Sequence, residues 1–165
     1  MSTKHILLAL LVPIIWGIGF VIAKPAMDFI PPILLNGLRW SITGFIMIWF
    51  VPFPKSFFKE IFLIAFIGSA VQYSFTYSGL NLIEASTATL LVQSEVPFAI
   101  ILAYFILGEK PIIKNIVGLV IAFIGIVILS GNPNLNGKYI GVFFVLLGTL
   151  TWAFGQILAK PVAKK

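Results

Sequence analysis

Charged residues divide this chain into uncharged windows whose lengths match the thickness of a lipid bilayer. Four windows contain no Asp, Glu, Lys or Arg: residues 6–23, 61–83, 115–137 and 139–159. Each can cross about 30 Å of hydrocarbon as a helix that rises about 1.5 Å per residue. Two more crossings are expected over residues 33–51 and 86–107. Their single charges, Arg39 and Glu95, are tolerated where they face the interior of a helix bundle.

The composition agrees with burial in lipid. Hydrophobic residues make up 60% of the 165 residues and charged residues 10%, against roughly 45–50% and about 25% in a soluble domain. We therefore expect an all-α polytopic membrane protein with six transmembrane helices, at about residues 6–23, 33–51, 61–80, 86–107, 112–130 and within 139–165. The chain has no Cys and a single His, His5, so we expect no metal site and no cofactor.

The distribution of Lys and Arg predicts the orientation of these helices. With a cytoplasmic N-terminus, the inner side receives eight of the 11 basic residues and the outer side receives Lys24, Arg39 and Lys138. Both termini are then expected in the cytoplasm. The net charge of +6 is explained by lysines that flank helices and meet anionic lipid head groups, so no nucleic-acid partner is expected.

The sixth segment repeats part of the first. The pattern W-x-x-G-x-x-x-A-K-P begins at Trp16 and recurs from Trp152. The alternative is that apolar helices ending in Lys-Pro look alike by chance. If the repeat is real, its five-helix period is odd, and the second copy enters the membrane from the opposite side. Inverted repeats of this kind are typical of secondary transporters, which bind substrate near the midplane between the two halves.

Longer stretches carry a family resemblance. The runs IWGIGFVIAKPAMDFIPPILLNGLRW and LLVQSEVPFAIILAYFILGEKPIIKNIVGLVIAFIGIVIL resemble the first half of EamA-type transporters of the drug/metabolite transporter superfamily, over residues 6 to about 130. TWAFGQILAKP resembles the opening of the second half. The resemblance implies an exporter of amino acids and their metabolites in the bacterial inner membrane, with two inverted five-helix repeats. Such a unit has ten helices, and a partner that supplies the missing four is one way to complete it.

Glu95 is the most informative residue of the chain. It lies about midway along its helix, where an ionised carboxylate costs roughly 2.5–3.5 kcal/mol on insertion scales and needs a partner. Arg39 lies at a similar depth, so we predict that the two form an intramembrane ion pair. The pair either locks two helices together or supplies a carboxylate for coupling or substrate binding.

Pro97 marks a break at the same depth as Glu95. Proline lacks a backbone N–H, which leaves the carbonyl of Gln93 without its usual partner. Broken helices near the midplane often bind substrate, although a simple kink satisfied by neighbouring groups is the alternative. Gln93 and Glu95 project about 200° apart on a regular helix, so only one of them is expected to face a cavity.

A third group of polar residues shares one helix face. Gln72, Tyr73 and Thr76 are spaced by three and four and offer amide and hydroxyl partners to a small zwitterion. Ordinary hydrogen bonding between helices is the alternative. Tryptophan usually anchors a helix at the membrane interface, but Trp16 lies well inside its helix, so a ring that lines the same pathway is the second interpretation.

Two other function classes remain to be weighed. A membrane-embedded enzyme is disfavoured, because the chain has no G-x-S-x-G elbow and no His in the membrane to act as a base. A structural or accessory membrane protein would need no midplane charge, so Glu95 and Pro97 disfavour it. The leading interpretation is a secondary transporter, or half of a split one, that handles a small polar metabolite such as an amino acid.

The topology can be tested with reporter fusions. Fusions after Lys59, Lys114 and Lys165 should report the cytoplasm, and a fusion after Lys138 the periplasm, because the Lys bias holds the basic loops inside. A periplasmic signal at Lys165 would remove the sixth crossing and with it the inverted repeat.

Overall fold

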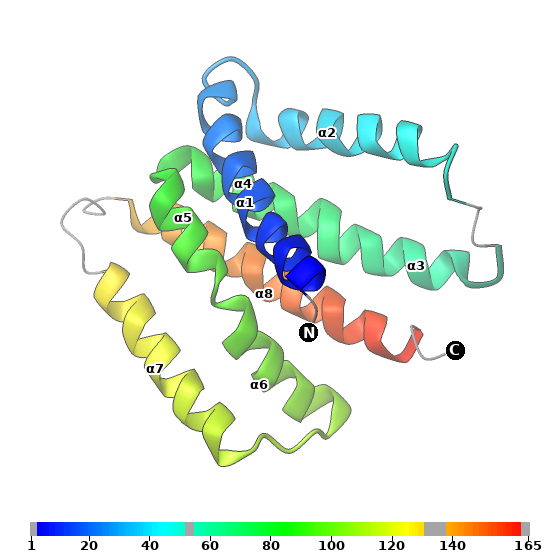
Figure 1. Cartoon of the computed structure of the whole chain (residues 1–165). Coiled ribbons are helices and arrows are strands. Elements are labelled where there is room, and N and C mark those ends of the chain that lie inside the picture. The colour runs from blue at the N-terminus through cyan, green and yellow to red at the C-terminus, as the bar shows by residue number, and fades with distance from the viewer. Residues whose placement is uncertain (1–2, 52–54, 131–137, 163–165) are drawn as a thin grey trace.

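The computed structural model describes residues 3–51, 55–130 and 138–162. In these ranges the helices form six rods (Figure 1). The first two rods are α1 (Thr3–Ala26) and α2 (Pro32–Met47), and the last two are α7 (Ile113–Ser130) and α8 (Tyr139–Val162). The third rod joins η1 (Lys55–Phe57), α3 (Phe58–Ala65), the π-helical segment η2 (Phe66–Val71) and α4 (Gln72–Leu82), and the fourth joins α5 (Ala85–Val92) and α6 (Glu95–Leu107).

Four of the rods are long and apolar enough to cross a membrane: Leu8–Ala26, Phe58–Leu82, Ala85–Leu107 and Tyr139–Val162. A shorter apolar stretch, Ile113–Gly125, lies in α7, and α2 has 16 residues. The expected all-helical, multi-pass fold is therefore confirmed, and its six rods fit the expected number. The division into a five-helix repeat and a partial second copy stays a prediction.

The second rod is shorter than the sequence suggested. It was expected to continue to Val51, but α2 ends at Met47, residues 48–50 form turns and Val51 lies in a bend. Val51 precedes a proline, and the residue before proline is disfavoured in the α-helical region. The second rod begins at Pro32. Proline is favoured in the first turn of a helix, because it has no N–H that would need a partner there.

The fourth rod is broken as the sequence predicted, one turn before Pro97. α5 ends at Val92, Gln93 and Ser94 form a turn, and α6 starts at Glu95. This break places Pro97 in the first turn of α6, where its missing N–H interrupts no helical hydrogen bond. The carbonyl of Gln93 accepts a long bond of 3.5 Å from the Val96 N–H, and the Ser94 hydroxyl bonds to the Leu91 carbonyl at 2.6 Å.

α8 packs along the third rod and against α5 and α6, and Figure 1 shows it beside α3 and α4. Three glycines one heptad apart permit this close approach. Gly141 faces Gly79 and Ile83, Gly148 faces Gln72 and Thr76, and Gly155 faces Gly68. Small residues at such contacts let helix backbones approach closely in a membrane, where dispersion replaces the hydrophobic effect as the attraction between helices.

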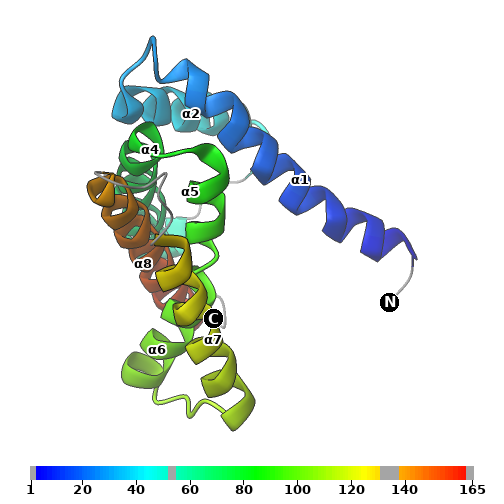
Figure 2. The same cartoon turned by 90° about the vertical axis from the view of Figure 1, so that its left-hand side faces the viewer.

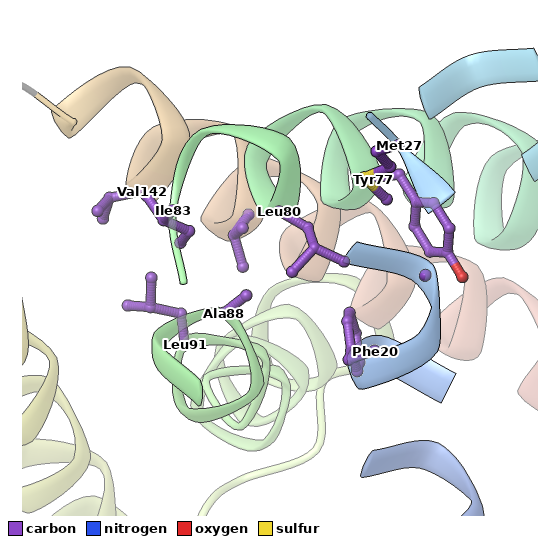
Figure 3. Close-up of a cluster of buried hydrophobic side chains, with 10 residues drawn as sticks. Phe20, Met27, Tyr77, Leu80, Ile83, Ala88, Leu91 and Val142 are labelled. Carbon is purple, nitrogen blue, oxygen red and sulfur yellow. The ribbon is translucent and has the colours of Figure 1, made fainter. Parts of the chain in front are cut away.

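The buried apolar core lies at one end of this packing. Figure 3 shows side chains from α1 and the turn after it, α4, α5 and α8 meeting there: Phe20, Met27, Tyr77, Leu80, Ile83, Ala88, Leu91 and Val142. Leu80, Ala88 and Leu91 have no exposed surface. The core therefore fixes α5, and with it the start of α6, relative to α4 and α8.

The rods differ greatly in how much of their surface is covered. In α8, 39% of the most apolar window is buried, against 6% in α1, and Figure 2 shows the N-terminal part of α1 extending away from the other helices. The exposed side chains of α1 are apolar, including Ile14, Ile15 and Val21. Such a surface suits contact with lipid or with further helices.

The glycine contacts predict a local sensitivity to added volume. A Cβ at position 148 would lie 2.9 Å from both the Gln72 carbonyl oxygen and the Thr76 nitrogen, and would overlap the Thr76 hydroxyl. Gly148→Ala should therefore lower the free energy of unfolding in detergent by about 1–3 kcal/mol. Gly118→Ala is the matched control, because a Cβ there meets nothing within 4 Å. Equal effects would show that α8 does not depend on this contact.

Candidate functional site

A groove of about 570 Å³ lies between α6 and α8. This volume is in the usual range for small-molecule sites, about 300–1,000 Å³. Its walls are mostly small or apolar side chains, such as Ala99, Ile100 and Ala103 of α6. The polar groups in it are few, which is the usual composition of a site that orients a small ligand.

One face of α8 supplies most of the polar groups of the groove. Trp152, Gln156 and Lys160 follow one another at intervals of four residues, so they share a face of the helix. At the far end of this row, the Lys160 ammonium pairs with the Glu109 carboxylate, with Nζ 2.6 and 2.7 Å from its two oxygens. Gln156 and Trp152 also line a second groove of about 190 Å³ on the α3 side of α8.

Glu95 lies in the groove at the first turn of α6. The partial positive charge of a helix N-terminus stabilises an anion there, and Trp152 of α8 lines the same groove. The Oε2 atom is buried and has no hydrogen-bond partner. Glu95 therefore carries an unsatisfied acceptor near the middle of the span Ala85–Leu107.

A second, much smaller cavity adjoins Glu95. Its volume is about 10 Å³, and its lining includes four residues that the sequence singled out: Trp16, Gln72, Tyr73 and Glu95. Gln72 is only 6% exposed. Its amide nitrogen donates to the Thr76 hydroxyl at 3.0 Å, while its Oε1 has no partner. Their roles in a substrate pathway stay predictions.

The remaining predicted site residues lie apart from both cavities. Thr76 is fully buried and accepts the bond from Gln72. Pro97 is buried in α6, whereas Gln93 is exposed and lines neither cavity. Of the two side chains expected to point in opposite directions, Glu95 is the one that reaches the cavities.

Arg39 has partners other than the one predicted. Its guanidinium donates a hydrogen bond to the Tyr77 hydroxyl and lies 5.6 Å from the centre of the Tyr73 ring. Among the residues that the structure describes, no ion pair joins Arg39 to Glu95. A phenol and two aromatic rings satisfy the cation instead, and a separate cavity of about 20 Å³ adjoins it. This arrangement does not contain the expected pair of Arg39 and Glu95, which stays a prediction.

The two tryptophans of the repeated motif meet. The rings of Trp16 and Trp152 are 6.3 Å apart, edge to face, a favoured geometry for aromatic pairs. Trp16 and Tyr73 line the cavities of both Arg39 and Glu95. The two ionisable groups therefore share neighbours although they do not pair.

Comparison with known proteins identifies the family of this membrane-embedded site. The model of the EamA-like transporter family matches residues 3–131. The chain belongs to the EamA-like transporter family. This confirms the resemblance to EamA-type transporters.

Several relatives of the EamA-like chain carry transporter names. A "Probable amino-acid metabolite efflux pump" of Escherichia coli is 32% identical over 166 residues, which cover 98% of this chain and 55% of the relative. Its counterpart in Salmonella typhimurium matches equally. An "Uncharacterized transporter YvbV" of Bacillus subtilis is 27% identical over 99% of this chain and 56% of its own length. The chain thus spans about half the length of these relatives. No solved structure matches it.

Sequence reasoning missed part of this EamA-like site. It used Trp152 only as a member of the repeat, and it gave no site role to Gln156, Lys160 or Glu109. The spacing of Trp152, Gln156 and Lys160 on a predicted helix was the signal that could have shown a polar row. The partners of Lys24 were also missed. Its Nζ donates hydrogen bonds to the backbone carbonyls of Leu80 and Asn81, at 2.6 and 2.8 Å.

Double-mutant cycles distinguish the predicted partner of Arg39 from the observed one. Arg39→Met and Tyr77→Phe should show a coupling of about 1.5–3 kcal/mol in the free energy of unfolding. Either substitution alone already removes the charged hydrogen bond between the two side chains, so the second one has nothing further to remove. Arg39→Met with Glu95→Gln should be additive within about 0.5 kcal/mol. The reverse ranking would mean that the predicted ion pair forms and the Tyr77 contact carries little energy.

Proposed function

We propose that this chain takes part in the export of small metabolites that carry an ammonium group. The observation that carries the proposal is the position of Glu95 in a groove of substrate size. A carboxylate held near the middle of a membrane span is costly unless it serves a charged or polar partner. A primary ammonium supplies both the charge and the hydrogen bonds that this carboxylate can accept.

The rest of the groove supports an amino-acid-like substrate. The Gln156 amide lies one turn, a rise of about 6 Å, beyond Trp152 on the same face of α8. An amide nitrogen there can donate to a carboxylate or an ester oxygen. The apolar walls between them leave room for a short side chain. The name of the E. coli relative, a probable amino-acid metabolite efflux pump, supports the same substrate class.

The expected orientation gives the groove a direction. With both termini in the cytoplasm, the Lys160 end of α8 faces inward, and the groove runs from Glu95 near the midplane toward the cytoplasm. An exporter takes its substrate from this side. In alternating access, rocking of one half against the other would then close this route and open one to the outside.

The mostly uncovered face of α1 leaves room for further helices in the working transporter. The matched relatives are nearly twice as long as the stretch that they share with this chain. We place additional helices, from a partner or from the rest of a longer protein, against α1. They would complete the wall on the Trp16 side of the site.

Ligand binding to the purified chain tests the proposal. In detergent, radiolabelled L-serine should bind at least tenfold more tightly than N-acetyl-L-serine, which lacks the ammonium. Glu95→Gln should weaken serine binding by about tenfold to a hundredfold, the value of a charged hydrogen bond of about 1.5–3 kcal/mol.

Glu60→Gln is the matched control, because Glu60 is an exposed carboxylate of α3 that lines neither groove. It should bind serine like the unaltered chain. Equal binding of the two ligands, or unchanged binding after Glu95→Gln, would contradict an ammonium site at Glu95.

A further inference from the structure

Two residues that line the small cavity beside Glu95 each carry a buried acceptor with no partner. The acceptors are Gln72 Oε1 and Glu95 Oε2. An unpaired buried acceptor costs about 1–3 kcal/mol, and more when it is charged. The bond from the Gln72 amide nitrogen to Thr76 fixes the amide with its oxygen free. Two acceptors of this kind at one cavity call for a shared occupant that is a donor or a cation.

The surroundings of the cavity favour positive charge. Three aromatic rings line it, those of Trp16, Tyr73 and Trp152, and ring faces attract cations. Val92, the last residue of α5, also lines it, so the partial negative charge of a helix C-terminus lies close by. The Thr149 hydroxyl donates its proton to the Val145 carbonyl at 2.8 Å, which leaves its oxygen lone pairs available.

The volume limits the occupant to one small ion. About 10 Å³ is roughly the space that one water molecule requires, which is too little for a metabolite. Divalent cations usually take six or more oxygen ligands with several carboxylates or waters, and this cavity offers a single carboxylate.

We propose that this cavity binds one Na⁺ ion through Gln72 Oε1, Glu95 Oε2 and the Thr149 hydroxyl oxygen. Glu95 lines both this cavity and the large groove. An ion and a substrate ammonium then share one carboxylate, so each weakens the binding of the other. That sharing couples entry of Na⁺ to release of substrate. The coupling rests on the proposed function, whereas the binding of Na⁺ does not.

Tryptophan fluorescence can follow the ion directly. Trp40→Phe with Trp49→Phe leaves Trp16 and Trp152, which both line the cavity. In detergent, replacing choline chloride with NaCl at constant ionic strength should change the emission saturably and raise the melting temperature. KCl should act at least tenfold more weakly, because the larger ion exceeds the cavity.

Substitutions test which side chains the response to Na⁺ depends on. Gln72→Met removes the free acceptor at similar side-chain length and should weaken Na⁺ at least tenfold, whereas Gln72→Glu retains an acceptor, adds charge and should keep the response. Gln156→Met is the matched control, because Gln156 lines the large groove and not the small cavity. Circular dichroism and gel filtration check folding, and Thr149→Val replaces any Gln72 variant that fails them.

The outcomes separate this inference from the proposed function. Identical responses to Na⁺, K⁺ and choline, a response to lowered pH alone, or an unaffected Gln72→Met variant would each overturn the Na⁺ site. Serine binding without a Na⁺ response would overturn the inference and leave the ammonium site in place. A Na⁺ response without serine binding would support the ion site and contradict the proposed function.

Discussion

The close approach of α8 to the third rod positions every other part of the site. Gly148 lies against Gln72 and Thr76, and Gly155 against Gly68. With the backbones this near, Thr149 and Trp152 of α8 reach the cavity that Gln72 lines. Glu95 of α6 lines the same cavity. In lipid this packing is stabilised by dispersion and hydrogen bonds, so the loss of one close contact is not replaced by a hydrophobic gain elsewhere.

The broken fourth rod makes an anion tolerable at this depth. Glu95 sits in the first turn of α6, and α5 ends beside it at Val92. One helix end thus favours the carboxylate and the other favours a cation near it. A continuous helix would have placed Glu95 among paired peptide groups without either effect. The site therefore depends on the backbone break as much as on the carboxylate.

The helices were predictable because charges are expensive in hydrocarbon, so the sequence had to space them by bilayer widths. The same reasoning picked out Trp16, Gln72, Tyr73 and Glu95, which do meet at one cavity. Reasoning from depth did not find the observed partner of Arg39. Tyr77 accepts a hydrogen bond from Arg39. Depth alone could not decide between Tyr77 and Glu95 as the partner of Arg39, because depth does not say which helices are neighbours. The polar row of α8 was missed because the sequence does not show which face of a helix a groove will follow.

The π-helical segment η2 was not predicted from the sequence either. It rotates the residues that follow it in the third rod relative to those that precede it. A π turn holds one residue more than an α turn, so Gln72 and Thr76 are rotated by about 100° relative to where an unbroken helix would place them. A rod one residue shorter would lose only about 1.5 Å of length, yet its polar face would turn away from α8. Which side chains line the cavity therefore depends on the number of residues in η2. Insertions and deletions, more than substitutions, are the changes by which a helix of this kind can exchange one set of lining side chains for another.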